Sequence, residues 1–115
     1  MKSGITFNQG DIAVVPFPFS NLKEIRQRPV LILSKNSYLN ECDDVLVCGI
    51  TSNLKNSKYS IFIDNSNLIE GKIPVKSKIK VDKLFNLEQE IIIKKIGRVN
   101  KETFREVKKE FVGLI

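Results

Sequence analysis

Two polar residues stand next to apolar runs whose pattern is typical of β-strands. Arg28 precedes Pro29 and the run Val30–Leu33, and Thr51 ends the run that starts at Asp44. Pro29 biases Arg28 toward extended geometry, so we expect its guanidinium at the mouth of a strand. A guanidinium is permanently charged, and its fork of donors fits a phosphate. Alone, such an arginine is weak evidence, because arginines often pair with a carboxylate at a sheet edge; Thr51 at the end of an adjacent strand makes the evidence for a site stronger.

Composition bounds the kind of protein that carries these residues. The chain has 115 residues, 42% of them hydrophobic, which suits one domain over residues 1–115 with one modest core. The net charge is +6 and the sequence pI is about 9.4. The basic surplus lies between Lys72 and Lys109, and it favours a polyanionic partner such as nucleic acid, although solubility alone would also account for it.

Metal, cofactor and membrane functions find no support in the sequence. Cys42 and Cys48 form no CxxC pair, and the sequence has no histidine, so we expect no metal site and no cofactor. Apolar runs are too short to span a bilayer, and the start of the chain lacks the apolar core of a signal peptide. We therefore expect a reduced, cytoplasmic protein without a membrane anchor.

Short strands followed by one helix are the elements that must position Arg28 and Thr51. Val30–Leu33 is apolar at every position, so one face should meet the core and the other a helix or a second subunit, which favours a homodimer. The polar loop Ser20–Gln27 should rim the site. We predict strands at 10–15, 30–33, 44–51, 58–63 and 90–99, a turn at 64–67, a segment of basic and apolar alternation at 73–84, and a helix capped by Asn100 whose buried stripe contains Phe104, Val107, Phe111, Val112 and Ile115. This order predicts a mostly β fold, a small, partly open antiparallel barrel closed by a C-terminal helix.

Three motifs resemble those of a known family. GDIAVVPFPF from Gly10, RPVLILS from Arg28 and ITSN from Ile50 resemble, in this order and spacing, the MazF/PemK family of toxin endoribonucleases. The resemblance covers nearly the whole chain and implies an SH3-like barrel of the MazF/CcdB type in a homodimer. It also implies that Arg28 and Thr51 lie at an RNA cleavage site.

The first loop departs from the family pattern. Family members commonly carry Gly-Ser-Glu ahead of the arginine, whereas this chain has Ser20-Asn21-Leu22-Lys23-Glu24 without the glycine. Glu24 is either the carboxylate that takes a proton during cleavage or a solvated loop residue. Phe17 and Phe19 are expected mainly as structural anchors, with base stacking as the alternative.

The resemblance implies the toxin of a type II toxin–antitoxin pair. Such a toxin is a sequence-specific, metal-independent endoribonuclease that cuts single-stranded RNA and so inhibits translation. The 2′-hydroxyl attacks the neighbouring phosphorus, leaving a 2′,3′-cyclic phosphate and a 5′-hydroxyl. The partner would be an acidic, partly disordered antitoxin. A same-fold inhibitor of DNA gyrase and a non-catalytic RNA-binding module are the alternatives. The expected RNA contacts are Lys23, Arg26, Ser52, Asn53, Ser77 and Lys78.

Overall fold

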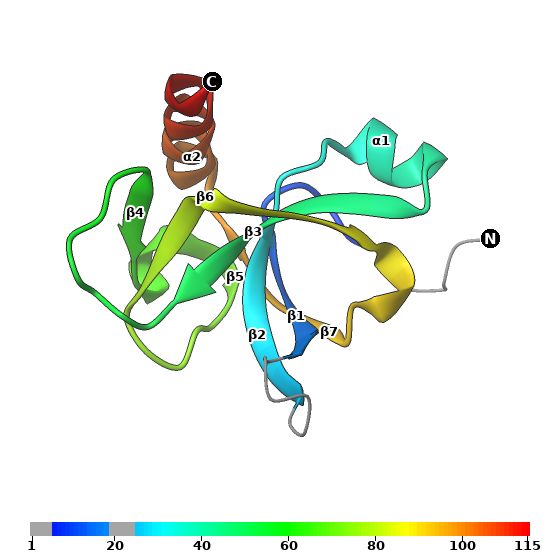
Figure 1. The fold of residues 1–115 in the computed structure, drawn as a ribbon, viewed down its shortest axis with the longest axis horizontal. Helices are drawn as coiled ribbons and strands as arrows, with labels where there is room; N and C mark the ends of the chain where they lie inside the picture. Colours follow the sequence, from blue (N-terminus) through cyan, green and yellow to red (C-terminus); the bar gives the residue numbers. More distant parts are fainter. Residues whose placement is uncertain (1–5, 19–24) are drawn as a thin grey trace.

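One antiparallel sheet organises the chain. The computed structural model describes residues 6–18 and 25–115, and there the seven strands follow the order β4-β6-β3-β2-β1-β7-β5. Figure 1 shows the sheet curving into a half-open barrel, with the long C-terminal helix against one end. The predicted fold class is thus confirmed. The elements are β1 Asp11–Pro18, β2 Ile25–Ile32, α1 Asn36–Glu41, β3 Asp44–Thr51, β4 Ser60–Ile63, the 3-10 helix η1 Asn65–Asn67, β5 Leu68–Gly71, β6 Ser77–Glu88, the 3-10 helix η2 Gln89–Ile91, β7 Lys94–Val99 and α2 Lys101–Leu114.

Strand β1 runs further than predicted. We expected it to end at Val15, but Pro16 and Pro18 continue the ladder opposite Gln27 and Ile25 of β2. Val14 O accepts from Ile93 N, so even-numbered residues of β1 turn their backbone toward β7. The ladder with β7 ends at Val14. The backbone nitrogens of both prolines therefore face the side where β7 is absent, and their missing donors break no hydrogen bond.

Strand β2 starts earlier than predicted. It begins at Ile25, so Arg28 lies inside the strand opposite Val15 and not at its mouth, and Pro29 is not its first residue. Leu33 N donates to Leu46 O, which turns odd-numbered residues toward β3. The ladder with β3 begins at Val30 and Gly49. Pro29 thus faces β3 just beyond that ladder, where a donor is not needed.

Both faces of the apolar end of β2, residues 30–32, are covered within this one chain. Leu31 belongs to a core under helix α2, which also holds Ile12, Ile79 and Val107. Residues on the other face, Val30 and Ile32, pack in a second core, whose members include Phe7, Leu39 of α1, Val45, Val47 and Ile92. The helix alternative is therefore the one observed. The apolar strand no longer argues for a second subunit, and the homodimer stays a prediction.

Helix α2 begins where the sequence predicted. The side-chain Oδ1 of Asn100 accepts from Thr103 N at 2.8 Å, which satisfies an otherwise unpaired donor of the first turn. Val107 is fully buried and Phe104 packs against the same core. The predicted stripe is wrong at its end, because Val112 is 61% exposed and Ile115 is 89% exposed. The stripe that packs against the core therefore ends at Phe111.

Strand β6 is bent by an irregular register. Its pairing with β3 passes from Cys48–Leu84 to Gly49–Lys80, so the residues between Lys80 and Leu84 have no partner on β3. The predicted alternation is confirmed over residues 77–81, where Ser77, Ile79 and Val81 are buried and Lys78 and Lys80 are half-buried. It is wrong before the strand, where Val75 is 54% exposed. Strand β6 spans Ser77–Glu88, whereas the predicted segment spanned Ile73 to Leu84. This bend turns two parts of one strand around Gly49.

Two other strands begin later than predicted. Tyr59 has a φ of 55°, so β4 starts after it at Ser60. The 3-10 helix η2 occupies the start of the predicted strand 90–99, and β7 begins at Lys94.

Strand β5 approaches β7 closely at two glycines. A Cβ on Gly71, whose φ is 74°, would collide with the Ile96 carbonyl, and one on Gly97 would lie 2.8 Å from Glu70 O.

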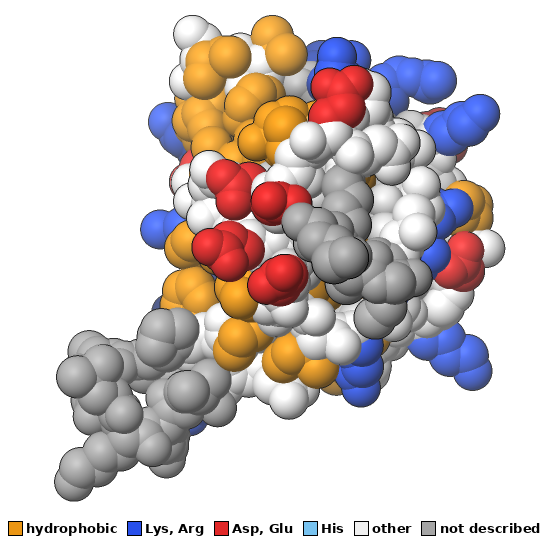
Figure 2. All heavy atoms as spheres, turned by 90° about the vertical axis from the view of Figure 1, so that its right-hand side faces the viewer, with side chains coloured by type: hydrophobic (Ala, Val, Ile, Leu, Met, Phe, Trp, Pro, Cys, Tyr) orange, Lys and Arg blue, Asp and Glu red, His pale blue; other side chains and the backbone are white. Residues whose placement is uncertain are grey.

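Charge is unevenly spread over the surface. Figure 2 shows acidic side chains gathered on the face that carries α1 and the neighbouring ends of β3 and β6. Asp44 and Glu88 lie opposite each other across these strands. Within the described ranges, no helix has the length and apolar character needed to cross a bilayer. The acidic face is distinct from the basic cavity described next.

Candidate functional site

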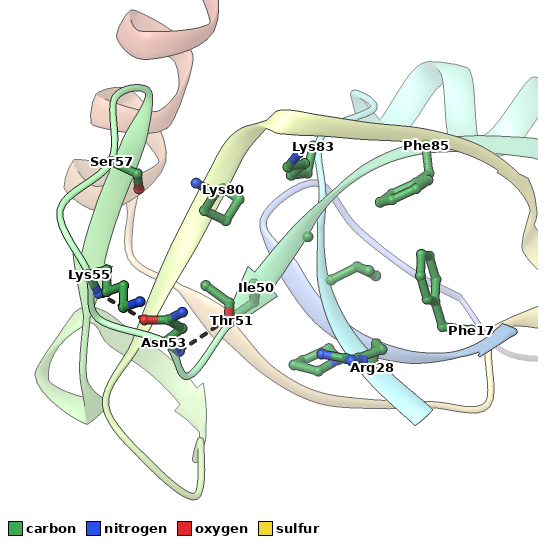
Figure 3. Close-up of a pocket in the computed structure, with 13 residues that line it drawn as sticks. Phe17, Arg28, Ile50, Thr51, Asn53, Lys55, Ser57, Lys80, Lys83 and Phe85 are labelled. Carbon is green, nitrogen blue, oxygen red and sulfur yellow. Dashed lines mark hydrogen bonds between the residues drawn. The ribbon is translucent and has the colours of Figure 1, made fainter. Parts of the chain in front are cut away.

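A cavity opens where β2 and β3 diverge. Beyond the pair Val30–Gly49 the two strands no longer form a ladder, and Pro29 has no donor to hold them together. The cavity has a volume of about 390 Å³, within the range of about 300–1,000 Å³ typical of ligand sites. Its lining residues are Phe17, Arg28, Pro29, Val30, Gly49, Ile50, Thr51, Asn53, Lys55, Ser57, Lys80, Lys83 and Phe85 (Figure 3).

Arg28 and Thr51 reach this cavity from neighbouring strands. Arg28 is half-buried in β2, and Thr51 is half-buried as the last residue of β3. The sequence prediction that the two residues share one site is therefore consistent with the cavity lining. A guanidinium and a hydroxyl that line one cavity can both donate hydrogen bonds to phosphate oxygens.

The loop after β3 fixes the orientation of the Thr51 hydroxyl. Asn53 N donates to Thr51 Oγ1 at 3.1 Å, and Lys55 N donates to Asn53 Oδ1 at 3.1 Å. Lys78 Nζ donates to Lys55 O at 3.0 Å and so ties the loop to β6. Because Thr51 Oγ1 already accepts a hydrogen bond, its own hydrogen remains to be donated to a ligand.

Basic side chains rim the cavity. Lys55, Lys80 and Lys83 line it together with Arg28, and Figure 3 shows them spread from the loop to β6. Over residues 6–18 and 25–115, no carboxylate lies within ion-pair distance of these three lysines. Clustered cations without counter-charges raise the local concentration of an anion. The cavity is therefore suited to a phosphate chain.

Apolar side chains form the remaining wall. The rings of Phe17 and Phe85 meet edge to face, with centroids 5.3 Å apart and planes at 77°. Pro29, Val30 and Ile50 extend this wall. Phe17 thus anchors structure and lines the cavity at once, which leaves both interpretations of its ring in place.

The structure separates the predicted RNA contacts into groups. Asn53 lines the cavity with Arg28 and Thr51, whereas Arg26 and Ser52 are exposed outside the lining. Ser77 is 6% exposed, and its hydroxyl donates to Val75 O at 3.0 Å, away from the cavity. Lys78 holds the loop through Lys55 O. Two further predicted residues, Lys23 and Glu24, lie outside the described residues.

Sequence reasoning missed part of the lining. It did not select Lys55, Ser57, Lys83 or Phe85, and it noted Lys80 only as part of a basic strand face. The alternation around Lys80 was a usable signal. Nothing in the sequence indicated the bend that brings Lys83 and Phe85 to Gly49.

Neither a metal site nor a reactive thiol accompanies the cavity among the described residues. Among the residues with described positions, no three His, Cys, Asp or Glu side chains gather as a metal site. Cys48 of β3 is fully buried, and burial, with a smaller effect of the Asp82 charge, raises the pKa of its thiol to about 12. The thiol is therefore protonated at neutral pH and is no nucleophile.

Comparison with known proteins identifies the family. The sequence model of the PemK-like, MazF-like toxins of type II toxin–antitoxin systems matches residues 8–114. No curated protein matches the chain.

Solved structures with the same fold include an endoribonuclease from a mycobacterial species, with a TM-score of 0.76 and 14% identity over 97% of this chain and 93% of that one. A mycobacterial endoribonuclease bound to its cognate antitoxin gives 0.77 and 16% over 96% and 98%. The MazE–MazF complex from Deinococcus radiodurans gives 0.78 and 16% over 96% of both chains. Because the family match spans nearly all of the sequence, the chain belongs to the PemK-like, MazF-like toxins of type II toxin–antitoxin systems.

Proposed function

We propose that this toxin is an endoribonuclease that cuts single-stranded mRNA in the cytoplasm and so inhibits translation. The observation that carries the proposal is the meeting of Arg28 and Thr51 in one cavity with a lysine rim. This cavity offers hydrogen-bond donors to one phosphate of the RNA and positive charge to the neighbouring phosphates of the same RNA. The fold shared with proteins named as endoribonucleases supports the proposal.

The proposed reaction uses the RNA's own nucleophile. The 2′-oxygen attacks the adjacent phosphorus and loses its proton to a base, while the bond from phosphorus to the 5′-oxygen breaks and that oxygen gains a proton. The products are a 2′,3′-cyclic phosphate and a 5′-hydroxyl. Negative charge grows on the non-bridging oxygens in between, and preorganised donors that face these oxygens lower the barrier. DNA lacks the nucleophile and is no substrate for this step.

Each candidate residue has a distinct role in this scheme. The Arg28 guanidinium stabilises the growing charge, and the hydrogen of the Thr51 hydroxyl is donated to a non-bridging oxygen. Glu24 is proposed as the base that accepts the 2′-proton. Since side chains supply the positive charge, we propose that cleavage needs no metal ion.

The proposed partners are an antitoxin and a second copy of the chain. The mycobacterial and Deinococcus radiodurans structures contain their own antitoxins. For this chain we propose an acidic antitoxin with a disordered segment that folds over the basic cavity. The homodimer rests on the family resemblance. Light scattering of the toxin alone, and then of the toxin with the product of the neighbouring reading frame, tests both.

The experiment that tests the function is incubation of the purified protein with a long single-stranded RNA in excess EDTA. Defined fragments with 2′,3′-cyclic phosphate and 5′-hydroxyl ends are expected. A protein that binds RNA without cutting it would instead be a binding module, and one that inhibits gyrase without touching RNA would be the same-fold alternative. Either result would overturn the proposal.

Two variants test the assigned roles. Thr51→Val keeps the shape and loses the hydroxyl, so cleavage should fall on the order of 100-fold while RNA binding stays nearly unchanged. Glu24→Gln should slow cleavage strongly if the carboxylate is the base. A small effect of Glu24→Gln would assign that residue to the solvated loop.

A further inference from the structure

The cavity lining presents hydrogen-bond donors with few acceptors. Arg28, Lys55, Lys80 and Lys83 carry donors and no acceptor. Thr51 Oγ1 already accepts from Asn53 N. A base that enters this cavity therefore meets more side-chain donors than side-chain acceptors.

Asn53 also presents a hydrogen-bond donor to the cavity, because of its place in the loop. Its Oδ1 accepts from Lys55 N at 3.1 Å, so the amide group has its oxygen engaged and its NH₂ left. Figure 3 shows the oxygen turned toward Lys55 and the nitrogen turned toward Thr51 and the cavity. With its oxygen turned toward Lys55, the amide presents its NH₂ donor to the cavity.

Ser57 adds a further side-chain acceptor among the described lining residues. Ser57 donates its hydrogen to Ser60 Oγ at 3.0 Å, which leaves the Ser57 oxygen able to accept. Figure 3 places Ser57 at the opposite end of the cavity from Arg28 and Phe17. A base held near Arg28 therefore does not meet this oxygen.

We propose that the cavity selects a keto base, uracil or guanine, and that Asn53 is the specificity-determining residue. This inference rests on the proposed function and adds the base class that it recognises. The carbonyl oxygen O4 of uracil or O6 of guanine accepts from the Asn53 NH₂. Cytosine and adenine carry an amino group at that position, which would point a second donor at the amide and lose this hydrogen bond.

The test uses an isosteric change with a matched control. Asn53→Asp keeps an oxygen for Lys55 N and replaces the cavity-facing NH₂ with an acceptor. Asn56→Asp makes the same change on the same loop, at an exposed residue outside the lining. Asn53→Ser keeps a short side chain that can accept from Lys55 N and adds no charge. Thermal melting verifies that each variant folds.

Each protein is given a pool of RNAs of random sequence, and the cut sites are sequenced. The wild type should favour uracil or guanine over cytosine and adenine on the order of tenfold at one position near the cut. Asn53→Asp should lose or reverse this preference, Asn53→Ser should weaken it, and Asn56→Asp should keep it. A wild type with no keto preference at any position, or an Asn53→Asp variant with the wild-type preference, would overturn the inference.

A second arm keeps the inference separate from the proposed cleavage. The same RNA pool is selected by binding to the protein, and the bound sequences are compared with the input. If the wild type cuts no RNA but enriches keto bases in an Asn53-dependent way, the cleavage proposal fails and this inference stands. If the wild type binds RNA without base preference, or binds none, the inference fails.

Discussion

Two clusters of basic side chains on the same sheet differ in what balances their charge. In the first cluster, between β1, β5 and β7, Asp11 is fully buried and its Oδ1 lies 2.7 Å from Arg98 Nε and 3.4 Å from Lys95 Nζ. Glu70 Oε2 lies 2.6 Å from Lys95 Nζ. The second cluster lines the cavity with lysines that have no carboxylate at ion-pair distance within the described residues.

The difference separates charge that holds the fold from charge that awaits a ligand. In the β7 cluster (Asp11, Glu70, Lys95 and Arg98) each cation pairs with an anion of the same chain. Both charges of such a pair therefore stabilise the folded state. The cavity lysines form no ion pair with a carboxylate of the described residues, so their charges add no ion-pair stabilisation there. A polyanion would supply the missing charge. Variants of the first cluster should therefore change stability, and variants of the second should change the response to RNA.

The largest expected effect is that of Arg28→Ala. Loss of a donor that faces developing charge typically lowers a rate about 100- to 1,000-fold. Arg28→Lys keeps the charge and loses the forked arrangement of donors, so its cleavage rate should lie between those of Arg28→Ala and the wild type. The measurement is the initial rate of RNA cleavage by protein with an unchanged circular dichroism spectrum. Arg98→Ala is the matched control from the β7 cluster, and it should cut at nearly the wild-type rate while unfolding earlier. Equal cleavage rates for Arg28→Ala and the wild type would contradict the functional difference between the two clusters.

The next effect is on stability and belongs to Asp11. Asp11→Ala leaves Arg98 and Lys95 with Glu70 alone and removes the acceptor of Asn8 N. Breaking a buried ion pair by removing one partner costs about 3 kcal/mol. Urea unfolding measures this free energy. The cleavage rate per folded molecule should stay unchanged, and a rate loss as large as that of Arg28→Ala would show that the two clusters are not separate.

A smaller effect is expected of Lys80→Met. The side chain keeps its length and loses its charge, so RNA binding should weaken several-fold and the slope of log affinity against log salt should shrink by about 0.7. The free energy of unfolding should change by less than about 0.5 kcal/mol, because Lys80 has no ion pair in the described chain to lose. Lys108→Met on α2 removes the same charge outside the cavity lining and serves as control. Equal salt slopes for the two variants would remove Lys80 from the RNA path.

The elements that sequence predicted well are those with strong local patterns. Helix α2 has its Asn100 cap and its buried Val107, and β3 runs from Asp44 to Thr51 as predicted. Local pattern failed where register decides. Pro16 and Pro18 remain in a strand because their nitrogens face no partner, and that depends on where β7 ends.

The candidate site was predicted in part for the same reason. Arg28 and Thr51 are marked by motifs, and Asn53 is the last residue of the motif ITSN that contains Thr51. Lys55, Lys83 and Phe85 enter the cavity through a loop and through the bend of β6, neither of which leaves a periodic signal. The apolar run Val30–Leu33 was interpreted correctly as doubly covered, but which element covers it is a tertiary fact.

The smallest expected effect sharpens the comparison through pH. The hydrogen bond from Lys95, aided by the charges of Lys95 and Arg98, lowers the pKa of Glu70 from its ordinary 4.5. Since the folded-state pKa lies below the unfolded one, the stabilisation is fully present above pH 4.5 and is lost as the pH falls through the folded value. Glu70→Gln should therefore be slightly less stable than the wild type at pH 7, and the difference should vanish in acid. Because Glu70 is half exposed, 0.5 M salt should also shrink the difference. A difference that persists unchanged at low pH would mean that Glu70 acts through packing against β7 and not through its charge.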